Sequence, residues 1–189
     1  MTPSDLRLSV TDSVVVVVDI QDKLLAKMPT AEGLLRNAGF ILDVANLLGV
    51  PVVATEQYPK GLGPTAPAIA SRLTLPCLAK TAFSCCDAEG FLPTLTEFQR
   101  PVAVVLGMET HVCVLQTALG LLEAGYRVHL PEDALAARGS LDHNLALRQL
   151  ARVGAVVTTC ETIAFQWLRD ATHPHFKAVS KLIIERSTL

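Results

Sequence analysis

The sequence predicts a three-layer, doubly wound α/β sandwich, with helices on both faces of a six-stranded parallel sheet. Val14 to Ile20 is a β-branched run that carries a carboxylate near its end, typical of a parallel strand buried on both faces. Runs of this kind alternate with segments of helical periodicity, which favours right-handed βα units. The 189 residues are half hydrophobic, enough for one core. We therefore expect a single domain over residues 1–189.

The first half of the chain supplies three strands and two helices. After the strand at Val14–Ile20, a helix is expected from about Thr30 to Leu48, because apolar residues recur there at helical spacing and Gly49 closes the pattern. The remaining segments expected in this half are a strand over Pro51–Thr55, a strand over Pro76–Ala82 and a helix over Ala88–Phe98.

The second half repeats the alternation. A strand over Pro101–Leu106 leads into a helix from about Thr110 to Ala124, which Gly125 ends. Two further strands and three further helices complete the expected order: Arg127–Leu130, helix Leu141–Val153, Ala155–Thr159, and helices Glu161–Arg169 and Phe176–Glu185.

Composition excludes several classes of function. The formal net charge is −2 and no basic block occurs, so we expect no nucleic-acid partner. No apolar run is long enough for a membrane span or a signal peptide, which favours a cytoplasmic location. Five cysteines without a C-x-x-C pair argue against a disulfide framework and a zinc site. No phosphate-binding glycine motif occurs, which argues against a nucleotide cofactor, and His173 and His175 have no companion ligands nearby in the sequence, so we expect neither a cofactor nor a metal.

Cys113 lies where an apolar strand and a polar turn lead into a helix. The unpaired N–H groups and positive end of a helix can lower a thiol pKa from about 8.5 to between about 3.5 and 7.5. Cys113 is thus a candidate nucleophile, expected as a thiolate. The alternative is a buried cysteine that packs as a small hydrophobe.

Charged residues follow the ends of other predicted strands. Asp19 ends the first strand, Glu56 the second, and Lys80 lies near the end of the third. The carboxyl ends of parallel strands meet in one crevice, so these groups should converge on Cys113. Asp19 could then take the thiol proton while Lys80 holds negative charge in place. Alternatively, Asp19 caps a turn and Lys80 is an ordinary solvated lysine.

Three segments, Val17–Asp22, Ala79–Ser84 and Gly107–Val114, resemble the three motif blocks of the isochorismatase-like cysteine hydrolases, in order and at comparable separation. Segments Thr55–Thr65 and His173–Lys177 further resemble the subgroup of isochorismatase domain-containing proteins. The resemblance covers nearly the whole chain and implies the Rossmann-like fold of that family.

The resemblance implies a catalytic triad of Asp19, Lys80 and Cys113, with an acyl-enzyme formed on Cys113. It also implies a cis peptide between Met108 and Glu109, which would direct the backbone N–H groups of Glu109 and Cys113 at an oxyanion.

Two departures limit the resemblance. Nicotinamidases of the superfamily bind a metal through an Asp-x-His segment, whereas Glu56, Gln57 and Tyr58 stand here. True isochorismatases lack the cysteine nucleophile, so the family name does not give the reaction.

These observations favour a metal-independent cysteine hydrolase acting on a small amide or a related C–N or ester bond. The alternatives are a thiol-redox protein and a non-catalytic binding protein on the same fold. We expect a small-molecule substrate and a homo-oligomer, either a dimer or a tetramer. The residues expected to line the substrate pocket are Gln57, Tyr58, Phe83 and His111.

Overall fold

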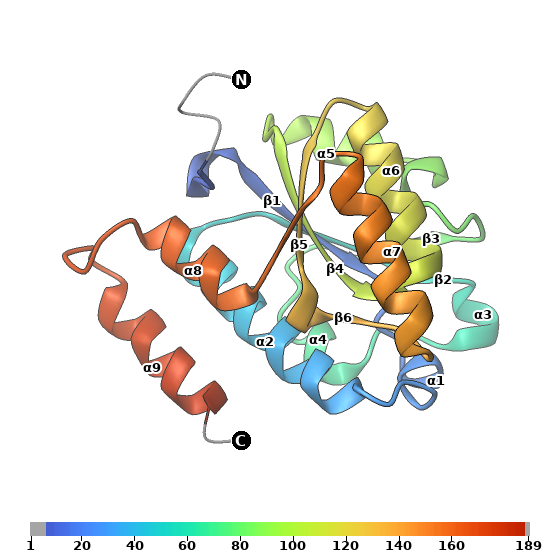
Figure 1. The fold of residues 1–189 in the computed structure, drawn as a ribbon, viewed down its shortest axis with the longest axis horizontal. Helices are drawn as coiled ribbons and strands as arrows, with labels where there is room; N and C mark the ends of the chain where they lie inside the picture. The colour runs from blue at the N-terminus through green and yellow to red at the C-terminus, as the bar shows by residue number, and fades with distance from the viewer. Residues whose placement is uncertain (1–6, 188–189) are drawn as a thin grey trace.

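A computed structural model describes residues 7–187 and contains the predicted α/β sandwich (Figure 1). The predicted bounds of the single domain, 1–189, extend beyond these residues. The sheet runs in the order β3-β2-β1-β4-β5-β7, with β6 paired to β4, and every strand pair is parallel. Its strands are β1 (Ser13–Val18), β2 (Val52–Gln57), β3 (Leu78–Lys80), β4 (Val102–Met108), β5 (Arg127–Pro131), β6 (Leu135–Ala136) and β7 (Val156–Thr158).

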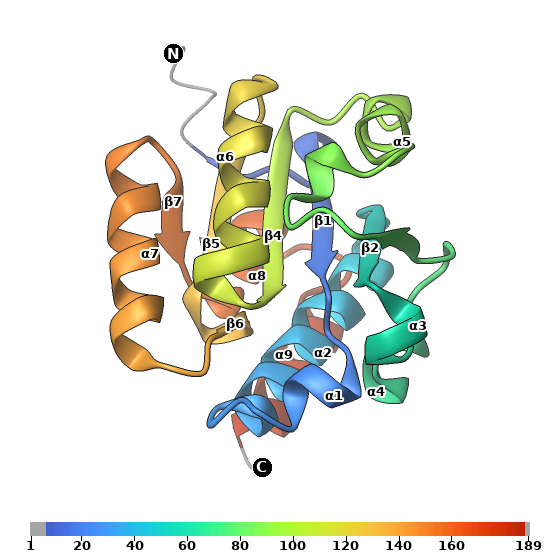
Figure 2. The ribbon, with the colours of Figure 1, turned by 90° about the vertical axis from the view of Figure 1, so that its right-hand side faces the viewer.

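Helices cover both faces of this sheet, as Figures 1 and 2 show. The α-helices are α1 (Asp22–Leu25), α2 (Ala31–Leu48), α3 (Pro59–Leu62), α4 (Pro67–Ala70), α5 (Phe91–Glu97), α6 (Leu115–Glu123), α7 (Ser140–Arg152), α8 (Cys160–Leu168) and α9 (Phe176–Ser187). Short 3₁₀ turns lie at η2 (Val10–Asp12), η3 (Cys85–Asp87) and η5 (Glu132–Ala134), and η4 (Thr110–Val114) is a π-helical turn.

Two apolar cores result from the side-chain alternation of the strands. Val15 and Val17 of β1 face α2, α8 and α9, whereas Val14, Val16 and Val18 face α5, α6 and α7. All five valines are almost completely buried, as expected for a strand covered on both faces. The valine run is therefore what fixes β1 at the centre of the molecule.

Gly107 allows β1 and β4 to approach closely beside the site. It pairs with Val18 and has φ +124°, and a Cβ atom there would lie 2.1 Å from the Val18 carbonyl oxygen. Only glycine fits such an approach. The residues that follow the two strands, Asp19 and the turn at Glu109, are therefore held close together.

The structure confirms the six predicted strands and adds β6, a two-residue strand too short to leave a periodic pattern. The third strand is shorter than predicted, because β3 lies at the sheet edge and pairs only with β2. The helix predicted from Ala88 begins at Phe91, since Gly90 before it is left-handed. The helix predicted from Thr110 begins with the π-helical turn η4.

Candidate active site

Asp19 follows β1 directly and is completely buried. Its backbone is left-handed, with φ 52°, a conformation that Asp adopts more readily than most residues. The turn is held by two backbone hydrogen bonds: Asp19 N donates to Thr55 O, and Gln21 N donates to Asp19 O. The Asp19 carboxylate thus lies at the carboxyl ends of β1 and β2, as predicted.

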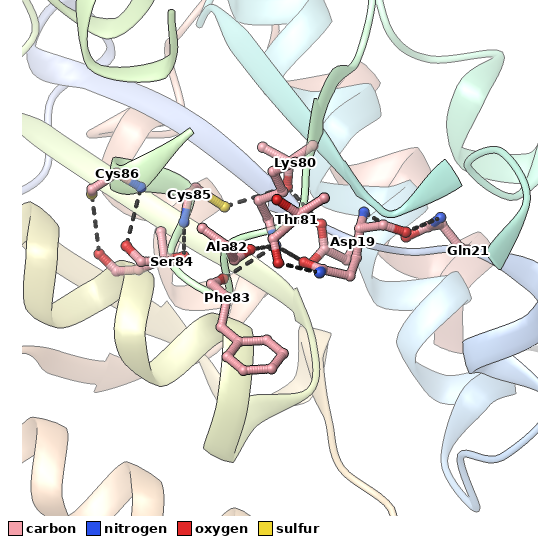
Figure 3. A network of polar contacts seen from close by, with 12 residues as sticks. Asp19, Gln21, Lys80, Thr81, Ala82, Phe83, Ser84, Cys85 and Cys86 are labelled. Atoms are coloured by element: carbon pink, nitrogen blue, oxygen red, sulfur yellow. Dashed lines mark hydrogen bonds and ion pairs between the residues drawn. The ribbon is translucent and has the colours of Figure 1, made fainter. Parts of the chain in front are cut away.

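Lys80 forms a buried ion pair with Asp19, with 2.6 Å between Lys80 Nζ and Asp19 Oδ2 (Figure 3). Neither side chain is exposed to solvent. The other carboxylate oxygen, Oδ1, accepts a hydrogen bond of 2.8 Å from Thr55 Oγ1. A buried carboxylate needs such partners, and the structure overturns the alternative of a solvated Lys80.

The Lys80 ammonium is saturated by protein acceptors. Besides Asp19, its Nζ lies 2.6 Å from Gln57 Oε1, 3.2 Å from Ala82 O and 3.1 Å from Phe83 O. An ammonium has three N–H donors, so these four acceptors use its whole donor capacity. Lys80 therefore holds Asp19 and the segment after β3 in place, with no N–H group left for another partner.

Gln57 is a member of the site whose role the sequence did not suggest. Its Nε2 donates to Thr81 O at 2.8 Å, and its backbone N–H donates to Gln21 Oε1 at 2.9 Å. Both ends of the Gln57 amide are thus bonded within the protein, toward Lys80 and Thr81. The only sequence signal is its place at the end of β2, opposite Lys80 in register.

Cys113 lies in the π-helical turn η4 and is 7% exposed. Burial, together with the negative charge of Asp19 and a hydrogen bond to Asp19, raises the pKa of its thiol to about 12, although the charge of Lys80 acts in the opposite direction. The expectation of a lowered thiol pKa is therefore wrong. Desolvation and the nearby Asp19 carboxylate raise the pKa of Cys113 by more than the positive N-terminal end of the helix lowers it. A helix N-terminus lowers a thiol pKa mainly where the thiol has access to solvent.

Cys85 is a second buried thiol in the same neighbourhood. Its Sγ lies 3.3 Å from Thr55 Oγ1. Thr55 donates its hydroxyl proton to Asp19, so the Cys85 S–H must donate to Thr55. Burial and the charge of Asp19 raise the pKa of Cys85 to about 11, and Cys85 in turn contributes to the raised pKa of Cys113.

The turn before Cys113 contains the cis peptide between Met108 and Glu109 that the family resemblance implied. The Glu109 carboxylate accepts a hydrogen bond of 2.8 Å from Arg138 Nε. The amides of Val112 and Val114 both donate to Glu109 O, so neither is free for another acceptor.

The four residues expected to line a pocket have different surroundings. Tyr58 and Phe83 are each 54% exposed, and Tyr58 borders a cavity of about 430 Å³ beside residues 79–82. His111 Nδ1 is buried without a hydrogen-bond partner among the described residues. The side-chain amide of Gln57 is hydrogen-bonded to Lys80 and to Thr81 O. The assignment of these four to a substrate pocket stays a prediction.

Glu56 does not join this site. Its Oε1 accepts from Thr65 N at 2.6 Å and from Thr65 Oγ1 at 2.9 Å, and Thr65 Oγ1 lies 3.3 Å from Cys77 Sγ.

Within residues 7–187, no group of three or more His, Cys, Asp or Glu side chains is arranged to hold a metal ion. In the same range no helix has the length and apolarity needed to cross a membrane.

Chemically, the site combines a buried carboxylate, a lysine ammonium bonded to it and a thiol that can pass its proton to the carboxylate. Such a pair can deliver a thiolate to an electrophile without maintaining it at rest. Asp19 and Lys80 face each other beside Cys113, which counts against a fold that has lost its reactive cluster.

Comparison with known proteins adds three similarities. The isochorismatase domain matches residues 13–162. The chain is 44% identical over 150 residues to isochorismatase domain-containing protein 2 of Bos taurus, covering 79% of this chain and 72% of that protein. The structure of MAR1 ribonuclease from Caenorhabditis elegans superposes with a TM-score of 0.90 at 36% identity, covering 94% of this chain and 92% of that one.

A more distant structure shares the fold. The YcaC gene product of Escherichia coli, described as an octameric hydrolase of unknown specificity, superposes with a TM-score of 0.85 at 23% identity over 97% of both chains.

Proposed function

This chain belongs to the isochorismatase domain family, and from that premise we propose that it is a metal-independent cysteine hydrolase of small amides or related C–N or ester bonds. The observation that carries the proposal is the buried Asp19–Lys80 pair beside the Cys113 thiol. In this proposal Cys113 is the nucleophile, Asp19 the general base and Lys80 the positioning cation.

The reaction begins with a neutral thiol. As Cys113 Sγ bonds to the substrate carbonyl carbon, its proton passes to Asp19 and the carbonyl electrons move to oxygen. When the tetrahedral intermediate collapses, the amine or alcohol leaves with the proton from Asp19, and a thioester remains. Water then attacks, giving a proton to Asp19, and the acid product leaves as Cys113 recovers its proton.

The developing oxyanion would be held by the backbone N–H groups of Glu109 and Cys113. The occupied amides of Val112 and Val114 support this choice, because they already donate to Glu109 O. The Lys80 ammonium is saturated, so it acts through Asp19 rather than on the oxyanion. Each oxyanion donor of this kind contributes about 100- to 1000-fold in rate.

The test is a hydrolysis screen of small amides and esters with matched variants. Asp19→Asn removes the base and should lower the rate by about 100-fold or more, and Cys113→Ala should abolish it. Glu56→Gln is the matched control, a carboxylate-to-amide change at the neighbouring strand end, and should leave the rate within about twofold. Equal activity of Cys113→Ala and the unmodified protein would reject the mechanism.

RNA is a second candidate substrate, because the similar C. elegans structure carries the name of a ribonuclease. The net charge of −2 and the interspersed charges of the chain do not favour it. Incubation of the protein with end-labelled RNA distinguishes the two: cleavage that persists in Asp19→Asn and Cys113→Ala would assign RNA hydrolysis to other residues.

Thiol redox chemistry is an alternative that Cys85 favours, since it is a second thiol beside Cys113. A peroxide would oxidise Cys113 to a sulfenic acid, and condensation with the Cys85 thiol would give a disulfide and water. The raised pKa values of both thiols oppose rapid oxidation. Mass spectrometry after peroxide treatment should find no Cys85–Cys113 disulfide if hydrolysis is the function.

We further propose a homo-oligomer in the cytoplasm. The description of the E. coli protein as octameric supports self-association, and the five cysteines are free within the described residues. Analytical ultracentrifugation of the full chain gives the oligomeric state directly, and a monomer at micromolar concentration would contradict it.

A further inference from the structure

Thr110, the first residue of the turn that carries Cys113, is completely buried. Its hydroxyl has two partners outside the turn. Thr110 Oγ1 lies 2.9 Å from Ala136 O and 2.9 Å from Nδ1 of His143 in α7. The polar contacts of this hydroxyl therefore connect the Cys113 turn to β6 and to α7.

The proton positions in this arrangement follow from counting donors. A threonine hydroxyl has one proton, and a backbone carbonyl can only accept. Thr110 therefore donates to Ala136 O, and His143 Nδ1 must carry a proton that it donates to Thr110 Oγ1. The other ring nitrogen, Nε2, lies 3.8 Å from Glu132 Oε1, within ion-pair range but beyond a hydrogen bond.

A second contact reaches the turn from the same side. Arg138, just before α7, donates to the Glu109 carboxylate. Arg138 and His143 also line a common cavity of about 380 Å³. The two residues at the start of the turn, Glu109 and Thr110, are thus bonded to Arg138, just before α7, and to His143 in its first turn.

We propose that His143 is a positioning residue for the nucleophile: its Nδ1–H group fixes Thr110 and thereby keeps Cys113 in contact with Asp19. This inference rests on the proposed function, in which Cys113 is the attacking group. His143 touches no reacting atom and acts through the turn. It lies 30 residues from Cys113 in sequence, and only the packing of α7 against η4 brings it to the turn.

The test measures alkylation of Cys113 by iodoacetamide in the full chain at pH 7.5, followed by mass spectrometry. His143→Ala should slow this reaction by about tenfold or more, since misplacing a reacting group by about 1 Å can cost about 100-fold. His143→Asn should restore most of the rate, because the asparagine amide can present an N–H group near the position of Nδ1. Glu132→Gln, the matched control on the other ring nitrogen, should leave the rate unchanged.

Two further measurements keep the proposal testable if His143→Ala does not fold. Thr110→Val should slow alkylation as His143→Ala does, while Thr110→Ser should not. Nitrogen-15 NMR of the unmodified protein should show His143 protonated at Nδ1, and a ring protonated only at Nε2 would overturn the inference.

The possible failures are distinguishable. If Cys113 of the unmodified protein is labelled no faster than in Asp19→Asn, the proposed function fails, and the positioning role fails with it. If Cys113 is labelled in an Asp19-dependent way but His143→Ala and His143→Asn both match the unmodified protein, only the positioning role of His143 is rejected.

Discussion

Two carboxylate–threonine–cysteine clusters lie at neighbouring strand ends of this molecule, and they differ in the further partners of the carboxylate. Asp19 accepts from Thr55, whose hydroxyl contacts Cys85, and Glu56 accepts from Thr65, whose hydroxyl contacts Cys77. Asp19 also pairs with a buried lysine and lies beside Cys113, whereas Glu56 accepts hydrogen bonds from the backbone and side chain of Thr65.

The comparison separates a structural cluster from a reactive one. At Glu56, the carboxylate closes the loop between β2 and Thr65, and its cysteine is half-buried. At Asp19, the buried ammonium of Lys80 pairs with the carboxylate, and a buried charge without such a partner is costly. In the proposed function, the buried lysine is therefore the feature that separates the reactive Asp19 cluster from the Glu56 cluster, because both have a carboxylate and a hydroxyl at a strand end.

Removing that lysine should have the largest effect on stability. Lys80→Met leaves the Asp19 carboxylate buried without its cation and should lower the free energy of unfolding by about 3 to 5 kcal/mol. Urea denaturation measures the change, with the exposed Lys27→Met as control, expected within about 0.5 kcal/mol. A loss as small as that of the control would mean that the ion pair does not set the two clusters apart.

Removing the hydroxyl of Thr55 or of Thr65 should have effects of intermediate size on stability, and the two changes form a matched pair. Thr55→Val removes a fully buried hydroxyl that donates to the ion-paired carboxylate and should destabilise the protein by about 2 kcal/mol. Thr65→Val should cost about 1 kcal/mol, because Glu56 keeps the hydrogen bond from Thr65 N. Thermal and urea unfolding of both variants measures the two losses of stability. A larger loss for Thr65→Val than for Thr55→Val would contradict the comparison.

The smallest expected effect is a change in how the free energy of unfolding depends on pH in the alkaline range. A thiol whose pKa is higher in the folded than in the unfolded state stabilises the fold fully below the unfolded pKa, and this contribution is lost as pH rises toward the folded pKa. Burial raises the pKa of Cys113 to about 12, and burial also raises that of Cys77. Cys113→Ala should therefore lose less stability between pH 8 and pH 10 than the unmodified protein does.

Cys77→Ala is the control for this measurement, because its half-buried thiol should change the alkaline slope less. Urea unfolding at the two pH values gives the slopes. A larger change in Cys77→Ala than in Cys113→Ala would indicate that the thiol of the Glu56 cluster is the more strongly desolvated one.

Much of the fold followed from patterns that are local in sequence. The valine run of β1 and the apolar stripe of α2 predicted their elements to within two residues, because each must bury a defined face. Asp19, Lys80 and Cys113 could be selected from their places at or just after the ends of strands, since parallel strands bring their carboxyl ends to one edge. The short strand β6 and the π-helical start of the Cys113 turn left no periodic signal.

The sequence by itself determined the sheet, the edge at which the charged residues gather and the family. Tertiary structure decided which groups meet there: which carboxylate pairs with a lysine, that Gln57 and two backbone carbonyls also accept from Lys80, and that Thr110 is hydrogen-bonded to His143. It also reversed the expected direction of the Cys113 pKa. The physical reason is that ionisation depends on desolvation and on charges brought close by packing, and neither is encoded in the residues adjacent to the thiol.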